Sequence, residues 1–135
     1  MILFSLFVSG LIVWSLAEYL VHRFVLHWMY PRYHAIHHKD ALDPTGDVGI
    51  VRGSLIAFVV LSLASVLGLS ALAFTLGLLV GYCIYVCIHE DMHQLPSDLM
   101  PTLNRLHADH HKLWRYNYGI TSPLWDWVFG TLKPK

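Results

Sequence analysis

Two long apolar segments are separated by polar stretches along the chain. Ile2–Val21 is apolar apart from Glu18 near its end, and about 20 helical residues span roughly 30 Å, the thickness of the hydrocarbon core of a bilayer. Residues 54–88 contain no charged side chain. This second segment is too long for one membrane span but suits two, with a reversal at Gly68-Leu69-Ser70. The pattern predicts three transmembrane helices, over residues 2–21, about 54–67 and about 71–93.

The first apolar segment has one alternative interpretation, a cleaved signal peptide. Ser15-Leu16-Ala17 resembles a small-residue cleavage site, but no Lys or Arg precedes the apolar run, as a signal peptide requires. Cleavage would also remove the helix that leads into His22 and His27. We therefore expect a membrane helix.

The polar stretches carry turn signals and aromatic residues. Residues 28–52 contain Pro31 and then Asp43-Pro44-Thr45-Gly46-Asp47, and are expected to form a short loop outside the membrane. Residues 94–135 are interrupted by prolines and glycines and are rich in Trp, Tyr and Phe. Such aromatic segments favour the membrane–water interface. The expected fold class is therefore all-α and integral to the membrane, with about three transmembrane helices plus cytoplasmic and interfacial helices.

Composition supports this class. Of the 135 residues, 56% are hydrophobic and 13% are charged, so we expect a single membrane-embedded domain over residues 1–135. The formal net charge is zero and no long basic run occurs, so nucleic acid is not an expected partner. Cys83 and Cys87 lie one helical turn apart in an apolar segment and are expected to pack in the core.

The basic residues predict the orientation in the membrane. All nine lie on one side of the predicted spans: Arg23, Arg32, Lys39, Arg52, Arg105, Lys112, Arg115, Lys133 and Lys135. By the positive-inside rule this side is cytoplasmic, so the amino terminus is expected outside and the carboxyl terminus in the cytoplasm. The same topology brings every histidine to the cytoplasmic face.

The ten histidines fall into four tight groups. The groups are His22 and His27; His34, His37 and His38; His89 and His93; and His107, His110 and His111. Imidazole is the commonest metal ligand in proteins, and close repeats of this kind beside carboxylates are what a metal cage needs. The sequence therefore predicts a site for two metal ions with all ten histidines as ligands.

Spacing indicates how the histidines could be shared between ions. Residues four apart on an α-helix differ in direction by about 40°, so His89 and His93 can share an ion or flank two. His22 and His27 differ by about 140°, so either they serve different ions or the helix loosens there, as a π-bulge would allow. In the two H-x-x-H-H motifs, adjacent histidines diverge by about 100° and can address neighbouring ions.

The number of ligands favours iron. Ten imidazoles over two ions give five each, which leaves one position free on a six-coordinate ion, whereas zinc prefers four ligands and cannot change oxidation state. We expect two iron ions in function, with zinc able to replace them in purified protein. Glu18, Asp91 and Asp109 lie in or near the histidine motifs, and are expected to accept hydrogen bonds from the ligand rings.

The set H-x4-H, H-x2-H-H, H-x3-H and H-x2-H-H resembles the fatty acid hydroxylase and sterol desaturase superfamily of integral-membrane di-metal enzymes. EYLVHRFVLH at 18–27 is similar to its first histidine box, and NYGITSPLWDWVFGTL at 117–132 is similar to its carboxyl-terminal signature. The spacing is closest to the fatty acid 2-hydroxylase branch. A bacterial carotenoid hydroxylase would more usually show H-x4-H where this chain has His89-x3-His93.

The resemblance implies O2-dependent hydroxylation, less often desaturation, of a membrane lipid by two irons, here with a fatty acyl chain as the substrate. Some relatives carry a fused cytochrome b5 domain, which is not recognised in this sequence, so a separate electron-transfer protein of the cytochrome b5 or ferredoxin type is an expected partner. Many relatives have an additional amino-terminal transmembrane helix. A homo-oligomer is therefore one expected way of closing the lipid-facing cavity.

Two alternatives stay open at this point. A carotenoid or sterol hydroxylase or desaturase would use the same chemistry on another lipid. A non-catalytic haem- or metal-binding membrane protein belongs to a different class. Haem needs only two axial histidines on facing helices, and metal transport needs ligands strung through the bilayer, whereas these histidines cluster at one predicted membrane edge.

Overall fold

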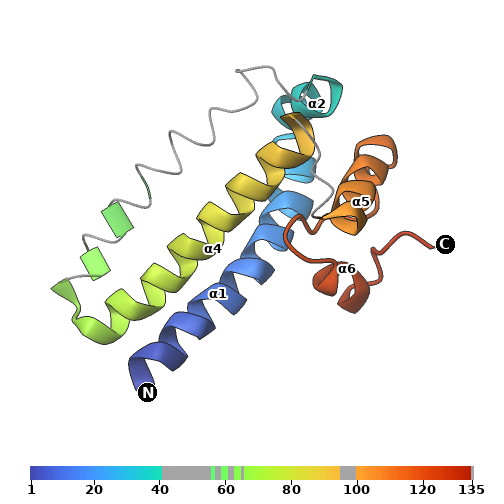
Figure 1. Ribbon diagram of the computed structural model, residues 1–135. Helices are drawn as coiled ribbons and strands as arrows, with labels where there is room; N and C mark the ends of the chain where they lie inside the picture. Colours follow the sequence, from blue (N-terminus) through green and yellow to red (C-terminus); the bar gives the residue numbers. More distant parts are fainter. Residues whose placement is uncertain (41–55, 57–58, 61–62, 65, 95–99, 135) are drawn as a thin grey trace.

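The computed structural model describes residues 1–40, 56, 59–60, 63–64, 66–94 and 100–134. Within these ranges the regular structure is entirely helical, which confirms the all-α prediction. Figure 1 shows two long helices side by side, with the shorter helices gathered at the end of the pair that lies away from the amino terminus.

The two long helices suit a membrane. Helix α1 covers Ile2–Leu20 and continues without interruption into the π-helical segment η1, Val21–Met29, while α4 covers Leu69–Gln94. Among the described residues, these are the helices long and apolar enough to cross a bilayer, and their apolar side chains are largely exposed, as lipid-facing residues would be. Half of the third predicted span, about 54–67, lies outside the described residues, so the structure leaves this helix a prediction.

The reversal predicted at Gly68-Leu69-Ser70 is present. Gly68 has a φ of 100°, a left-handed conformation that glycine adopts without a steric penalty. Helix α4 begins at the next residue, Leu69. The chain therefore turns back at this point and runs along α1 (Figure 1).

Glycines allow α1 and α4 to pack closely. A Cβ atom at Gly10 would collide with the backbone carbonyl of Phe74, and one at Gly77 would collide with the carbonyl of Phe7. Small residues at such crossings let membrane helices approach through their backbones. One prediction was wrong here: Cys83 and Cys87 are exposed rather than packed in the core. They lie on the outer side of α4, where lipid can cover an apolar side chain.

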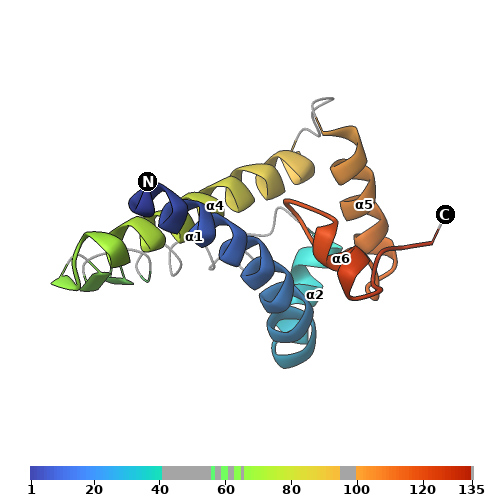
Figure 2. The ribbon, with the colours of Figure 1, turned by 90° about the horizontal axis from the view of Figure 1, so that it is seen from below.

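Three short helices surround the ends of the long pair. They are α2 (Pro31–Lys39), α5 (Pro101–Lys112) and α6 (Leu124–Val128), and Figure 2 shows α2 beside η1, with α5 and α6 on the right of the view. The loop predicted from residue 28 is wrong as far as Lys39, because η1 reaches Met29 and α2 follows. Pro31 is in the first turn of α2, where its missing N–H is not needed. Residues 41–52 of that predicted loop lie outside the described residues.

The carboxyl-terminal segment returns to the side of α1. Trp125 Nε1 donates a hydrogen bond to Ser15 Oγ over 3.0 Å, and the hydroxyls of Tyr19 and Thr131 are 2.9 Å apart. Tyr19 is fully buried and stacks on Phe129, with 5.3 Å between ring centroids. These contacts hold α6 and the preceding loop against the end of α1.

Candidate metal centre

The ring nitrogens of nine histidines converge into two groups. Within each group the nitrogens lie within 4.8 Å of one another, close enough to surround a metal ion. The first group contains His22, His27, His34, His38 and His110, and the second contains His37, His89, His93 and His107. The tenth histidine, His111, lies beside the second group, with its Nε2 atom 3.1 Å from that of His107.

The π-helical segment η1 brings His22 and His27 into the same group. A π-helix bonds residue i to residue i+5, and the Tyr30 N–H accordingly donates to the Val25 carbonyl over 2.9 Å. Residues five apart therefore lie nearly above one another, and both imidazoles reach His34, at 3.0 Å for His22 and 3.1 Å for His27. Of the two alternatives left open by the spacing, the structure has the loosened helix.

The second group is built on α4 and α5. The Nε2 atoms of His89 and His93, one turn apart on α4, are 3.2 Å from each other. His107 of α5 lies 2.9 Å from His93. His37 of α2 completes the group, with its ring centroid 4.6 Å from that of His93.

Adjacent histidines on α2 point to different groups. His37 belongs to the second group, whereas His38 and His34 belong to the first. On α5 the division is similar, since His107 lies in the second group and His110 in the first. The divergence predicted from the H-x-x-H-H spacing is thus present, and both short helices straddle the two groups.

The donor atoms fit a metal ion better than they fit one another. A neutral imidazole has one N–H and one lone pair, but His34 Nε2 has the Nε2 atoms of His22, His27 and His38 at 3.0, 3.1 and 3.0 Å. The buried His37 Nε2 has no hydrogen-bond partner among the described residues. A shared cation would satisfy all of these lone pairs at once.

The distances also suit a coordination number above four. For metal–nitrogen bonds of about 2.1 Å, ligands at right angles are about 3.0 Å apart and tetrahedral ligands about 3.4 Å apart. The close nitrogen pairs within the two groups are separated by 2.9 to 3.2 Å. Most of these closest pairs are nearer the right-angle separation than the tetrahedral one, while other pairs within a group are up to 4.8 Å apart.

Burial keeps these rings neutral, as metal ligands must be. Loss of hydration, reinforced by the neighbouring rings, lowers the pKa of His37 to about 3, of His38 to about 2 and of His110 to about 3. Burial also lowers the pKa values of His34, His107 and His111. The lone pairs of these histidines are therefore available at neutral pH.

Backbone carbonyls orient two of the rings. His22 Nδ1 donates to the Tyr118 carbonyl over 2.6 Å, and His110 Nδ1 donates to the Tyr116 carbonyl over 2.7 Å. With the proton on Nδ1, the Nε2 lone pair of each ring points into the first group. Such a bond to the far nitrogen fixes the tautomer and direction of a metal-binding imidazole.

The chain is similar to known proteins in sequence and in overall fold. The family model for fatty acid hydroxylase matches residues 7–131, nearly the whole chain. The chain belongs to the fatty acid hydroxylase family. The full-length scs7p structure, in which only the hydroxylase domain is visible, has a TM-score of 0.76 at 29% identity, covering 98% of this chain and 56% of that one.

Curated relatives in the fatty acid hydroxylase family come from several kingdoms. The chain is 31% identical to the ceramide very long chain fatty acid hydroxylase scs7 of Schizosaccharomyces pombe, over 96% of this chain and 43% of the relative. It is 35% identical to the dihydroceramide fatty acyl 2-hydroxylase FAH2 of Arabidopsis thaliana, over 91% of this chain and 58% of the relative. The chain thus spans about half the length of these relatives.

In this member of the fatty acid hydroxylase family, Glu18 holds the loop that orients His22 and His110. Its carboxylate accepts hydrogen bonds from the Ile120 N–H over 2.9 Å and from the Thr121 N–H and hydroxyl over 2.7 and 2.8 Å. Asp109 forms an ion pair with Lys133 at 2.9 Å, and Asp91 lies half-buried on α4. Hydrogen bonding of these three carboxylates to ligand rings stays a prediction.

Sequence reasoning missed the groups that position His22 and His110. Backbone carbonyls carry no residue signature, so Tyr116 and Tyr118 could not be recognised. Asp126, which was also missed, accepts hydrogen bonds from the amides of Tyr118 and Gly119, each over 2.8 Å. The available signal was the carboxyl-terminal signature at 117–132, which contains this aspartate and the loop that it fixes.

Proposed function

We propose that this chain is an O2-dependent hydroxylase that acts on a membrane lipid, most directly on a fatty acyl chain, with two iron ions held by its histidines. The observation that carries the proposal is the convergence of nine imidazoles into two groups at one end of two apolar helices. That location gives a lipid-embedded chain access to a redox-active pair of ions. The relatives named as fatty acid and ceramide hydroxylases support the same reaction.

The histidines and the carboxyl-terminal segment have separate roles in this proposal. The first group would hold one ion and the second group, with His111, the other. The iron pair supplies the activation of O2 and the oxidation of an unactivated carbon. The loop at 116–121 keeps two rings aimed inward, and the aromatic residues after it limit the access of water.

The membrane arrangement follows the distribution of charge. The metal centre lies at the cytoplasmic face, with the amino terminus outside and the carboxyl terminus in the cytoplasm. A separate electron-transfer protein of the cytochrome b5 or ferredoxin type would dock on that side and supply the electrons. A second copy of the chain would close the lipid-facing cavity.

Removal of one histidine from each group tests the metal assignment. We expect His110→Ala and His37→Ala each to lose about one of two bound ions, because each variant opens one group, and to abolish lipid hydroxylation. Metal content is measured by mass spectrometry of the purified protein, and lipid products by mass spectrometry of cells with and without the chain. Lys112→Ala and Lys39→Ala, exposed neighbours on the same helices, serve as controls.

Several outcomes would contradict the proposal. Full metal content and activity in both histidine variants would reject the assigned centre. Oxygenated sterols or carotenoids in place of oxygenated acyl chains would move the substrate to another class of lipid. An intense Soret absorption band in the purified protein would indicate haem instead of the metal pair.

A further inference from the structure

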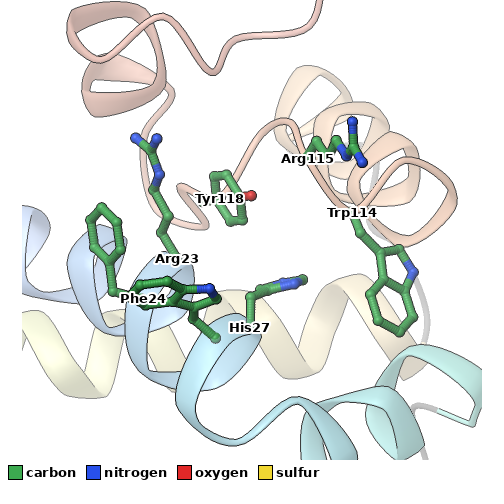
Figure 3. Close-up of a pocket in the computed structure, with 7 residues that line it drawn as sticks. Arg23, Phe24, His27, Trp114, Arg115 and Tyr118 are labelled. Atoms are coloured by element: carbon green, nitrogen blue, oxygen red, sulfur yellow. The ribbon is translucent and has the colours of Figure 1, made fainter.

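A pocket of about 510 Å³ lies beside the metal centre, between η1 and the carboxyl-terminal segment. Figure 3 shows Arg23, Phe24 and His27 on the η1 side, with Trp114, Arg115 and Tyr118 on the other. The volume is within the range of small-molecule sites. His27 belongs both to the pocket wall and to the first histidine group, so an occupant would lie next to that group.

The pocket wall carries two positive charges. The Arg23 guanidinium donates to the Tyr19 hydroxyl over 2.7 Å and lies over the ring of Phe24, 4.9 Å from its centroid. Both of these partners are uncharged. The Arg115 side chain is exposed at the opposite side of the pocket. Arginine presents several N–H donors in a plane and binds carboxylate or phosphate with two parallel bonds.

The carboxylate of Asp126, whose pKa is affected by the charge of Arg23, already accepts hydrogen bonds from other groups. Arg23 acts on Asp126 through its charge, but the Asp126 carboxylate accepts hydrogen bonds from the amides of Tyr118 and Gly119 and from the Thr131 hydroxyl, each over 2.8 Å. Those bonds fix the loop. Both arginines therefore keep N–H groups that an incoming anion could use.

The rest of the wall is aromatic and partly exposed. Phe24 is 44% exposed, Trp114 is 43% exposed, and Trp28 at the edge is 81% exposed. Arg23 lies within the same long helix that suits a membrane span. A charge in such a helix is costly unless it has a function, and aromatic rings beside it are typical of the membrane–water interface. The pocket thus combines an aromatic wall with an arginine on each of two opposite sides.

We propose that this pocket binds the anionic head group of an amphipathic lipid, a carboxylate or a phosphate, with Arg23 and Arg115 on its two sides supplying the positive charge. This inference rests on the proposed function, because it names the substrate class of the hydroxylase. The aromatic rings contact the first carbons of the lipid chain, and His27 places those carbons beside the first histidine group. A neutral ceramide would bring no negative charge to Arg115, and Arg23 would have only the influence of Asp126.

Binding measurements on the purified protein in a neutral detergent test this inference. The probes are palmitate, hexadecyl phosphate and the uncharged methyl palmitate, each competing with a fluorescent fatty acid. We expect one of the anions to bind at least about tenfold more tightly than the ester, since a charged hydrogen bond contributes about 1.5 kcal/mol or more. The anion that binds more tightly shows whether the head group comes from a free fatty acid or from a phosphorylated lipid.

Substitution of the arginines locates the binding. We expect Arg115→Gln to reduce the preference for the anion by about tenfold, and Arg23→Gln to do the same. Arg115 is exposed, so its loss leaves the fold unchanged even if Arg23→Gln disturbs the contact with Tyr19. Arg105→Gln, an exposed arginine of α5 outside the pocket, should bind like the parent protein.

The outcomes separate this inference from the proposed function. Equal affinity for palmitate, hexadecyl phosphate and methyl palmitate overturns it, as does an unchanged preference in Arg115→Gln. If lipid hydroxylation persists without any preference for anions, the hydroxylase stands and the anionic substrate class is rejected. If the protein prefers anions but oxidises no lipid, the hydroxylase function is rejected, and the binding of an anionic head group in the pocket stands.

Discussion

Each histidine directs one nitrogen inward according to what its other nitrogen contacts. In His22 and His110, a backbone carbonyl accepts the Nδ1 proton, at 2.6 and 2.7 Å. Both carbonyls belong to one short loop, and Glu18 holds that loop through the amides of Ile120 and Thr121. A buried carboxylate on α1 therefore acts together with Asp126 to set the direction of two rings that it does not touch.

Replacement of Glu18 by alanine should loosen the loop and the first histidine group. The change leaves two amides without their acceptor, and we expect the free energy of unfolding to fall by about 3 kcal/mol. Metal affinity should fall by about 10- to 100-fold because the rings of His22 and His110 are no longer fixed. Thermal unfolding in detergent and competition with a chelator measure the two effects.

Glu18→Gln is the matched control. Its amide oxygen can still accept hydrogen bonds from both backbone N–H groups, and its NH2 group can donate to the Thr121 hydroxyl. We expect this variant to remain close to the parent protein in stability and metal affinity. Normal stability and metal binding in Glu18→Ala would show that the loop does not depend on this carboxylate.

At the scale of elements, each long helix serves mainly one histidine group. Segment η1 supplies His22 and His27 to the first group, and α4 supplies His89 and His93 to the second. The two helices meet through Gly10 and Gly77, where backbone atoms approach directly. Their separation therefore sets the distance between the two groups.

Gly77→Leu should move α4 away from α1. The new side chain would collide with the Phe7 backbone, and we expect a loss of about 3 kcal/mol of stability from the forced separation. The second histidine group should be disrupted first, because two of its members are on α4. The metal content should therefore fall from two ions towards one. Metal analysis and thermal unfolding measure these effects.

Val80→Leu is the control for added volume on the same helix. Val80 is partly exposed on α4, so a larger side chain there can extend towards lipid. We expect no change in metal content or stability. If Gly77→Leu also leaves both unchanged, the close packing of α1 and α4 is not needed for the second group.

For the whole molecule, the buried histidines make stability depend on pH. Burial lowers the pKa of His37 and of His110 to about 3 in the folded protein, against 6.5 for an ordinary histidine. Below pH 6.5 these histidines therefore bind protons in the unfolded chain but not in the folded protein. The free energy of unfolding consequently falls as the pH is lowered from about 6.5 to about 3. Asp126, whose pKa burial raises, acts in the opposite direction, because there the folded protein binds a proton more readily than the unfolded chain does.

The measurement is thermal unfolding of chelator-treated protein across a pH series. We expect a constant unfolding temperature above pH 7 and a progressive decrease below about pH 6.5. Bound metal should steepen the decrease, because protons then also compete with the ion. An unfolding temperature that stays the same from pH 7.5 to pH 4.5 would contradict the burial of neutral rings.

Much of this molecule could be predicted from its sequence, since histidines and long apolar segments have distinct patterns. The spacing of His22 and His27 even indicated a loosened helix as one of two alternatives. The role of the carboxyl-terminal loop could not be predicted, because it acts through main-chain atoms. The outward position of Cys83 and Cys87 was missed because an apolar helix in a bilayer can direct such side chains to either lipid or protein.

The placement of His37 and His38 side by side on α2 has a consequence for how the centre fills. One ring serves each group, and α5 divides His107 and His110 in the same way. An ion that settles in either group anchors both helices, and thereby assembles the neighbouring group in advance. Uptake by the parent protein should then be cooperative, so that half-loaded molecules are scarce unless a substitution has opened one of the two groups.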